Sequence, residues 1–366
     1  MNKIIIGLGN TGSVIVRDIA KKNLNNVRLF AIDSQAKHIA IDNVSNVEYI
    51  PIVADDNAGS GRDRERGREM FRFNLEQGKL DKMLEECKNT DTIFVVSSAA
   101  GGTGSGSCPE LCRELIDDTS DRKVIPIIIC PNMEDPDAYH YNTTDLMVEL
   151  KDAKVGPYVI FRNPSSSDYE KINAEIVEAI TVMLGNHYET TDNDSIDASD
   201  LNNILSTVGR MMVLSVTGET VDEVRKKLLK QLVSSYQPNW DSAKVGYGVA
   251  AFSMKSINAG EDSKLIENDI LPKLEHCSDR YKNIVIDDNN GMVEVTLIIA
   301  GLPPVELKDV TTEYNETASI GDSLKKSERP RFMKRRHVSF NAFKADATLN
   351  VSEDKNVTIT ETDSSK

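Results

Sequence analysis

The sequence predicts an α/β protein with an open parallel sheet, followed by a smaller α/β part. The first observation is that short apolar runs, typical of buried strands, alternate with helical patterns over the first half of the chain. The second is a glycine-rich segment, 101–107, placed between a predicted strand and a predicted helix. The third is that the pattern changes in the second half, and hydrophobicity falls from about residue 306.

The first half is predicted to alternate strands and helices, as an open parallel sheet requires. Strands are expected over six apolar runs: 4–6, 27–32, 47–52, 92–96, 124–129 and 158–161. Helices are expected over 14–21, 109–116 and 169–184, and a polar, charge-rich helix from about 67 to 87. The last helix carries Ile172, Ile176, Ile180 and Met183 on one stripe and leads into an Asn/Asp-rich loop, 186–199.

The second half predicts a smaller domain with a mixed sheet, packed against the long helix. Strands are expected over 211–216, 246–253, 283–286 and 292–300, and helices over 219–232 and 264–274. We therefore divide the chain into a first domain, a central helix with its acidic loop, a second domain and a tail: 1–167, 168–200, 201–305 and 306–366. The tail is rich in Ser, Thr, Glu, Asp and Lys, a composition typical of largely disordered segments.

The composition narrows the class of protein. Of the 366 residues, 39% are hydrophobic and 28% are charged, which indicates a soluble globular protein. The net charge of −15 argues against general nucleic-acid binding, because phosphate contacts need a basic surface. The five scattered cysteines lack zinc-ligand spacing, and we find no signal peptide or apolar run of membrane-spanning length. We therefore expect a cytoplasmic protein.

The segment 101–107, Gly-Gly-Thr-Gly-Ser-Gly-Ser, has the composition of a phosphate-binding loop. Glycine allows a sharp turn that presents several backbone N–H groups to one anion, and the N-terminus of the following helix adds positive potential. A P-loop would carry a lysine at the end of its glycine run, and none is present. Charge neutralisation is therefore expected from amide dipoles and a bound Mg²⁺.

A second glycine-rich turn, 7–12, lies between the first predicted strand and helix, and Asp33 closes the second strand. Taken alone, these features predict a dinucleotide-binding fold, so an NAD-dependent oxidoreductase is an alternative. The second half lacks the residues of such an enzyme, since His187, His276 and His337 are each isolated. Two glycine loops at the carboxyl ends of parallel strands fit one nucleoside triphosphate better.

The segment 101–106 resembles the phosphate loop of the tubulin/FtsZ superfamily, with Ala100 in the place of that loop's first glycine. The similarity continues in the family's order along the chain. The segment 7–12 resembles the first nucleotide loop, and 58–67 resembles the loop that senses the γ-phosphate. The segment 197–200 resembles the acidic catalytic loop, and the strand starts of the second domain are matched by 209–212, 245–248 and 293–301. The acidic loop, Asp-Ala-Ser-Asp, has Ser195 where Asn is usual, and so looks closer to TubZ-like plasmid and phage tubulins than to cell-division FtsZ.

The resemblance implies a GTPase in which 1–167 binds GTP or GDP and 201–305 is the activation domain. Mg²⁺ is expected to be held through the phosphates and water, without protein ligands. Side-chain amides suit guanine because they can both donate and accept hydrogen bonds. The implied nucleotide contacts are Gly9, Asn10, Thr11, Gly59, Gly61, Arg62, Ala100, Gly101, Gly102, Thr103, Gly104, Ser105 and Gly106, with Glu134 for the ribose and Asn163 and Asn173 for guanine.

The resemblance also implies that subunits stack head to tail, so that Asp197 and Asp200 of one subunit act on the nucleotide of the next. Such a contact does not close on itself, so a filament is expected and assembly would activate hydrolysis. Asp200 aligns with the family's essential acid. Both residues also suit the N-cap of a short helical pattern, 201–205, and this alternative stays open.

The expected function is a GTP-hydrolysing filament protein that segregates or positions plasmid or phage DNA. The alternatives are an FtsZ-like division or scaffold GTPase and a nucleotide-binding module that does not polymerise. A basic segment, 325–336, is either a solvated charge run or a docking site for a DNA-bound adaptor, an acidic membrane surface or a neighbouring filament. Direct sequence-specific DNA binding is not expected.

Overall fold

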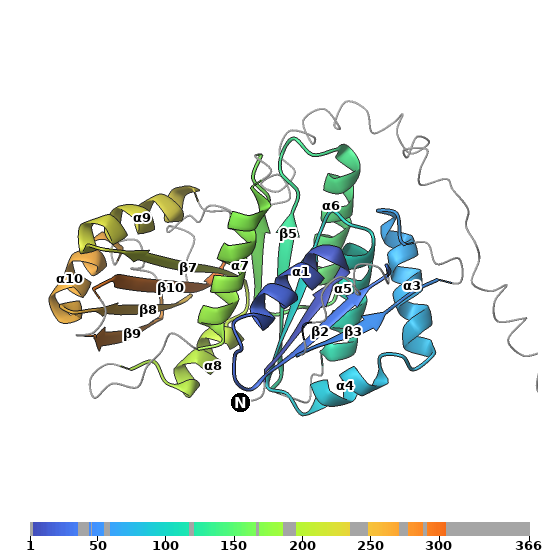
Figure 1. Cartoon of the computed structure of the whole chain (residues 1–366), viewed down its shortest axis with the longest axis horizontal. Helices are drawn as coiled ribbons and strands as arrows, with labels where there is room; N and C mark the ends of the chain where they lie inside the picture. The colour runs from blue at the N-terminus through green and yellow to red at the C-terminus, as the bar shows by residue number, and fades with distance from the viewer. Residues whose placement is uncertain are drawn as a thin grey trace, which may run out of the picture. The chain divides into compact units, whose positions relative to one another are not determined.

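The computed structural model describes residues 3–35, 44, 46–54, 59–116, 121–165, 168–185, 195–234, 248–270, 277–287 and 291–304. They form one ten-stranded sheet in the order β3-β2-β1-β4-β5-β6-β7-β10-β8-β9 (Figure 1). The basic segment, the three histidines at 187, 276 and 337, and most of the acidic 186–199 loop lie outside the described residues.

Six parallel strands make the first part of the sheet, as the sequence predicts. Their apolar runs are buried on both faces, because helices cover both sides. Neighbouring residues of β1 show this, since Ile5 packs into one core and Ile6 into the other. The strands are β1 (Lys3–Leu8), β2 (Val27–Asp33), β3 (Val47–Pro51), β4 (Thr92–Ser98), β5 (Lys123–Cys130) and β6 (Tyr158–Arg162).

The helices of this part divide between the two faces of the sheet (Figure 1). One face packs against α1 (Gly9–Ala20) and α7 (Tyr169–Met183). The other face is covered by four helices, α3 (Arg64–Glu76), α4 (Asp81–Lys88), α5 (Thr103–Leu115) and α6 (Asp137–Asp152). In a right-handed βαβ arrangement each helix starts near the carboxyl edge of the sheet, which places their N-termini together.

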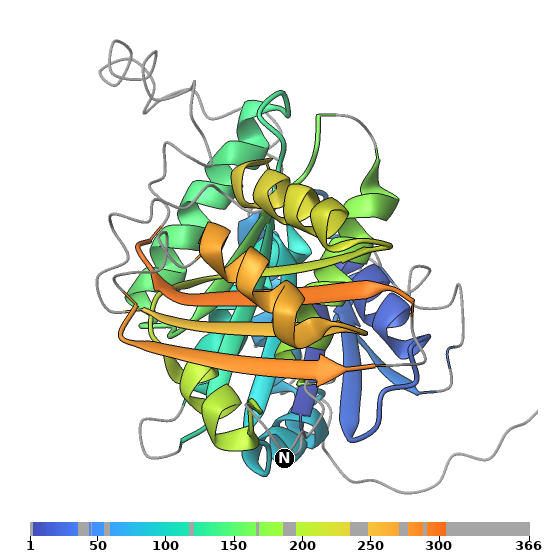
Figure 2. The ribbon, with the colours of Figure 1, turned by 90° about the vertical axis from the view of Figure 1, so that its left-hand side faces the viewer.

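The second part of the sheet is mixed, as predicted. It joins the first part through two residue pairs of β6 and β7, Tyr158 with Arg210 and Val159 with Met211. Figure 2 shows α9 and α10 lying across one face, and α7 packs against the other. Its elements are α8 (Ala198–Ser206), β7 (Arg210–Gly218), α9 (Val221–Ser234), β8 (Val249–Ser256), α10 (Ala259–Ile270), β9 (Asp279–Ile286) and β10 (Val293–Leu302).

Several predicted boundaries were wrong. The charge-rich helix expected over 67–87 is two helices, α3 and α4, separated by a turn in which Gly78 has a φ of +71°. α1 and α5 both begin earlier than expected, so the later glycines of the 101–107 run belong to a helix. The sequence pattern did not predict α6, whose buried face carries His140, Asn142 and Thr143.

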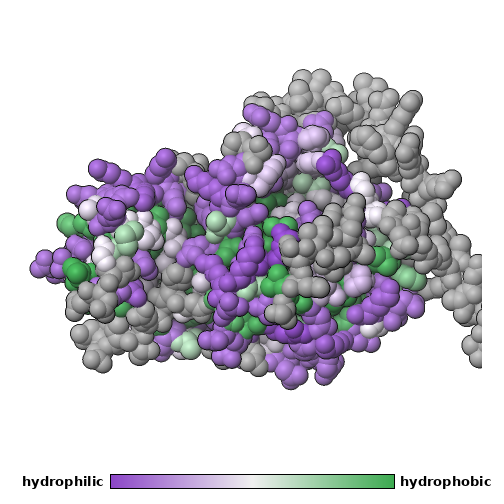
Figure 3. Space-filling model, in the orientation of Figure 1, coloured by the Kyte–Doolittle hydropathy of each residue, from purple (hydrophilic) through white to green (hydrophobic). Residues whose placement is uncertain are grey.

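The surface of the described residues is mostly hydrophilic in the view of Figure 3. Isolated apolar side chains are exposed, chiefly Val208 (75%) and Ile286 (65%), as is normal for a globular protein. All five cysteines are buried and unpaired. Within the part of the chain that the structure describes, no helix is long and apolar enough to cross a bilayer.

Candidate nucleotide-binding site

Two helix N-termini meet at the carboxyl edge of the parallel strands. β1 and β4 are neighbours, α1 begins directly after β1, and α5 begins shortly after β4. The N-cap residues, Leu8 and Gly102, make no side-chain hydrogen bond to the first turn. Each helix therefore presents backbone N–H groups that no capping side chain occupies, together with the positive end of its dipole.

The two loops touch each other. Gly9 has a φ of +67°, a conformation that favours glycine. A Cβ atom at Gly9 would lie 3.1 Å from the backbone nitrogen of Gly104 and 3.6 Å from the Cβ of Thr103. The first turns of α1 and α5, which hold the predicted contacts Asn10 and Thr11 and Thr103 to Ser105, therefore face one small volume.

The glycines of the 101–106 run serve two different purposes. A Cβ at Gly102 would lie 2.5 Å from the Ser60 hydroxyl, and one at Gly106 would lie 2.1 Å from the Arg64 carbonyl. Gly104 is similarly close to the Leu8 carbonyl, at 3.0 Å. Gly104 and Gly106 let α5 pack closely on β1 and α3 from within the helix, rather than from the open loop that we expected. Gly102, the N-cap of α5, lets it approach the loop before α3.

Gly101 differs from its neighbours, because no atom lies within 4 Å of the position where its Cβ would be. Gly61, in the loop before α3, also has nothing within 4 Å and adopts a φ of +61°. Packing within the described chain does not require a glycine at position 101. Open space at Gly101 leaves room for a ligand against the backbone.

Three hydroxyl groups join three segments behind the loops. The Thr103 hydroxyl lies 2.6 Å from that of Ser34 and 2.9 Å from that of Ser60. The backbone N–H of Ser34 donates to a carboxylate oxygen of Asp33 at 2.6 Å. The cluster links the end of β2, the predicted γ-phosphate loop (Gly59, Gly61 and Arg62) and the first residue of α5. Sequence reasoning missed Ser34 and Ser60, because single serines in loops carry no periodic signal.

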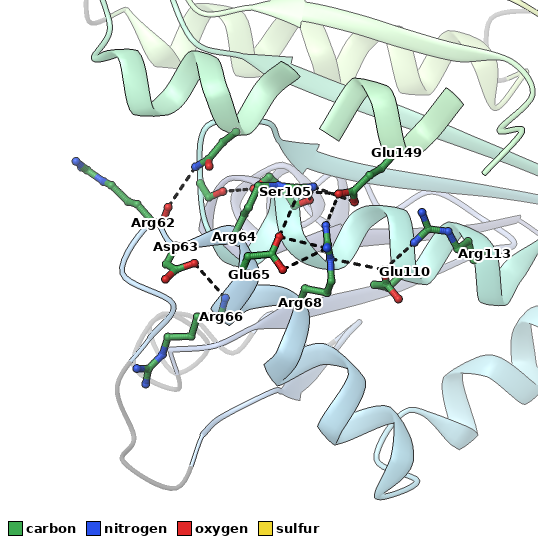
Figure 4. Close-up of polar contacts among 12 residues, drawn as sticks. Arg62, Asp63, Arg64, Glu65, Arg66, Arg68, Ser105, Glu110, Arg113 and Glu149 are labelled. Carbon is green, nitrogen blue, oxygen red and sulfur yellow. Dashed lines mark hydrogen bonds and ion pairs between the residues drawn. The ribbon is translucent and has the colours of Figure 1, made fainter. Parts of the chain in front are cut away.

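An ionic cluster joins α3, α5 and α6 beside these loops (Figure 4). The Arg64 guanidinium, on a residue only 3% exposed, donates to both carboxylate oxygens of Glu149 at 2.8 and 3.1 Å. It also donates to the Ser105 carbonyl at 3.1 Å. Arg68 bonds the same carboxylate, and Glu110 pairs with Arg72 and Arg113.

The cluster keeps Glu149 ionised. Burial would raise the pKa of Glu149, but the hydrogen bonds and charges of Arg64 and Arg68 outweigh burial and lower that pKa below its usual value. The sequence gives little sign of this arrangement, because a run of alternating Arg and acidic residues is usually a solvated surface.

The residues expected to hold the ribose and base follow the next two strands. Glu134 is exposed after β5, in a turn where its N–H donates to the Asn132 side chain at 2.7 Å. Asn163 directly follows β6, and Asn173 lies half-buried in the second turn of α7. All three therefore belong to the edge of the sheet that carries the glycine loops.

Asp197 and Asp200 lie elsewhere. α7 leaves the nucleotide edge and ends at Met183, and the next residue, Leu184, accepts a hydrogen bond from Lys3 at the start of β1. Asp197 and Asp200 belong to the start of α8. Figure 1 shows α8 near the amino edge of the parallel strands. One chain therefore does not bring the two carboxylates together with the glycine loops.

The N-cap alternative is confirmed for Asp197, whereas Asp200 lies in the first turn, because α8 begins at Ala198. The Asp197 carboxylate accepts from the backbone N–H of Ser199 and of Asp200, at 2.7 and 2.8 Å. The Asp200 carboxylate accepts from the Asp197 N–H at 3.1 Å, which completes a capping box. Asp197 is exposed and Asp200 half-buried, so both also remain open to a partner.

Glycine turns and uncapped helix N-termini at the carboxyl edge of a parallel sheet, without a lysine in the loop, are typical of a class of α/β nucleotide-binding proteins. Residues 2–171 match the model of the Tubulin/FtsZ family, GTPase domain. Over these residues the chain is a tubulin/FtsZ GTPase domain, and the predicted superfamily and fold class are confirmed.

Similar proteins extend the match over most of the chain. The tubulin-like protein CetZ of Methanothrix thermoacetophila is 21% identical over 337 residues, covering 83% of this chain and 89% of that protein. The structure of CetZ from Methanosaeta thermophila superposes with a TM-score of 0.69 at 18% identity, covering 95% of this chain and 98% of the other. A GTPγS-form protofilament of Bacillus thuringiensis serovar israelensis TubZ also gives 0.69, at 17% identity with 90% and 95% covered. CetZ and TubZ are thus equally similar in fold.

Proposed function

We propose that this GTPase binds GTP between its two glycine loops and assembles head to tail into filaments. The observation that carries the proposal is the meeting of two helix N-termini, free of capping side chains, beside the open space at Gly101. A triphosphate placed there would receive N–H groups from both helices and fill the space that the protein leaves. The family of the GTPase domain makes GTP the expected nucleotide.

The other contacts follow from the same placement. Glu134 would bind the ribose, and Asn163 and Asn173 would bind guanine, since all three belong to the same edge of the sheet. Among the described residues no three His, Cys, Asp or Glu side chains cluster as metal ligands. As the resemblance implies, the Mg²⁺ that balances the phosphate charge would be held through phosphate oxygens and water.

Hydrolysis would require two subunits. The glycine loops are at the carboxyl edge of the parallel strands, whereas Asp197 and Asp200 are near the amino edge. Stacking one subunit on the next would bring the acidic pair of one against the nucleotide of the other, where a carboxylate can orient the attacking water. The TubZ structure similar to this chain is described as a protofilament, which supports such stacking.

We further propose that the filaments act in the cytoplasm of a bacterial or phage-infected cell, where they position plasmid or phage DNA. The likeness to TubZ and the basic segment at 325–336, which would engage a DNA-bound adaptor, motivate this role. Removal of the residues after Glu328 should then leave GTPase activity and assembly intact while DNA capture in cells is lost. Loss of assembly would instead place the tail in the filament contact.

Complementation between two defective variants tests the shared site. Asp200→Asn keeps an oxygen for the helix cap but removes the charge, and Gly101→Val obstructs the nucleotide loop. Each variant alone should show GTP turnover at least about tenfold below wild type. In a mixture, junctions that combine an intact loop with an intact Asp200 should restore part of the turnover. No recovery, with both variants incorporated into mixed filaments, would contradict catalysis across subunits.

Light scattering with GTP, GDP and NADH tests the wider assignment. GTP should give scattering that rises with protein concentration, and GDP should not. Enhanced NADH fluorescence without any response to GTP would instead favour the oxidoreductase, and GTP binding without scattering would favour a module that does not polymerise.

A further inference from the structure

Asn142, on α6, connects the two loops that line the nucleotide site. Its side-chain nitrogen donates to the Ala100 carbonyl at 3.0 Å and to the Arg62 carbonyl at 3.2 Å. Ala100 precedes the open position at Gly101, and Arg62 lies within the predicted γ-phosphate loop, 58–67, just before α3. Asn142 is 1% exposed, so the donor end of both bonds is shielded from water, while Arg62 itself is exposed.

The chemistry of the amide fixes its orientation. Both partners are carbonyl oxygens, which only accept, so the NH₂ end must face them and each of its two hydrogens serves one loop. A carboxylate of the same shape would place an oxygen against both carbonyls. The Asn142 side-chain oxygen makes no hydrogen bond within the described part of the chain, so the residue acts here as a donor.

The loop held by Asn142 has an unfavourable backbone conformation. Gly61 and Arg62 have successive φ values of +61° and +68°. Glycine adopts this region readily, but for arginine it is sterically unfavourable. A hydrogen bond to the Arg62 carbonyl therefore stabilises a conformation that the chain would otherwise leave. The Arg62 side chain packs over the Tyr139 ring, also on α6, at 4.9 Å from its centroid.

The same helix also holds α3 further along. Glu149 lies two turns after Asn142 and accepts from Arg64 and Arg68 (Figure 4). α6 is thus bonded both to the loop before α3 and to the first turns of α3. The Ser60–Thr103 hydrogen bond already holds the loop at Ser60, and Asn142 holds it at Arg62.

We propose that Asn142 is a positioning residue for the terminal phosphate of GTP. Its two hydrogen bonds hold the carbonyls of Arg62 and Ala100 at a fixed distance from each other. Both loops can then contact the same phosphate group. This inference rests on the proposed GTP site. GDP would need only the loops after β1 and β4, whereas GTP would need the Gly59–Arg62 loop as well, so loss of Asn142 affects GTP selectively.

Binding of GTPγS and GDP to Asn142→Ala and Asn142→Asp, measured by calorimetry on the full chain, tests this role. The affinity for GTPγS should fall about tenfold or more, while that for GDP stays within about twofold. Asn142→Ser, which keeps one donor, should give an intermediate loss and remains informative if the other variants fold poorly. Equal losses for both nucleotides, or no loss, would overturn the proposal.

Asn283→Ala is the matched control. Asn283 is also fully buried and donates one side-chain bond, to the Ser253 hydroxyl at 3.0 Å, but it belongs to the second part of the sheet. Its loss should lower thermal stability and leave the ratio of the two affinities unchanged. Failure of the wild-type chain to bind either nucleotide would refute the proposed function instead.

A second measurement follows the loop directly. Trypsin cleavage after Arg62, identified by mass spectrometry, should be slow in wild type with GTPγS bound and several times faster in Asn142→Ala under the same conditions. An unchanged cleavage rate in the nucleotide-bound variant would show that Asn142 does not hold this loop.

Discussion

Arg64 supplies the hydrogen bond that Pro109 cannot make. Pro109 lies inside α5 and has no backbone N–H, so the Ser105 carbonyl four residues earlier has no helical donor. The Arg64 guanidinium donates to that buried carbonyl at 3.1 Å. A proline that would ordinarily break a helix therefore creates a binding point for α3, at the turn that also carries the phosphate loop.

A double-mutant cycle tests this relationship. Arg64→Lys keeps the positive charge but loses the paired bonds to Glu149 and Ser105, and we expect it to lower the free energy of unfolding by about 2–4 kcal/mol. In a Pro109→Ala background the helix supplies its own N–H to Ser105. The loss caused by Arg64→Lys should then be smaller by about 1 kcal/mol, measured by urea unfolding. Strictly additive effects would show that the two residues are independent.

The strands and the glycine loops could be predicted because their signals are local. Runs such as 92–96 and 124–129 are apolar throughout since helices cover both faces of the sheet, and glycine turns after adjacent parallel strands must lie side by side. The start of α5 at Thr103 was not predictable, because glycine disfavours helices and only tertiary packing against α3 explains it.

The residues that hold the loops of the site in place could not be predicted from the sequence pattern. The first half of the buried face of α6 is polar, with Asn142 and Thr143, and only Leu146 and Leu150 further along it are apolar. Arg64 looks like part of a solvated charge run until Glu149, distant in sequence, is brought against it. Asp197 and Asp200 were found through the family resemblance, and the sequence also anticipated their capping role.

Glu175, on α7, should make stability depend on pH near neutrality. Burial raises the pKa of its carboxyl group from 4.5 to about 7, although the charge of Lys171 opposes the rise. Because the folded chain holds this proton more tightly than the unfolded chain, the free energy of unfolding falls as pH rises from about 4.5 to about 7.

Glu175→Gln removes that penalty. At pH 8 the variant should be more stable than wild type by about 1–3 kcal/mol, and the gain should vanish near pH 4. Thermal melting across this range measures the difference. Glu170→Gln, which removes an exposed carboxyl from the same helix, is the control and should follow the wild-type profile. A gain that is constant from pH 4 to 8 would contradict the burial argument.

Substitution by alanine should affect stability very differently at two glycines of the 101–106 run. At Gly106 a Cβ would lie 2.1 Å from the Arg64 carbonyl, so Gly106→Ala must separate α5 from α3 and should cost about 3 kcal/mol or more. At Gly101 no atom lies within 4 Å and φ is outside the left-handed region, so Gly101→Ala should change stability by less than about 0.5 kcal/mol.

For nucleotide binding we expect the reverse order, with the larger loss of affinity in Gly101→Ala and the smaller loss in Gly106→Ala. The Gly101→Ala methyl group would occupy the space proposed for a phosphate, so the affinity for GTPγS should fall about tenfold or more despite an unchanged melting temperature. Gly106→Ala, studied at low temperature where it stays folded, should lose less affinity than Gly101→Ala. Full affinity in a stable Gly101→Ala protein would show that the phosphates do not lie against this residue, because nothing else in the described chain fills that space.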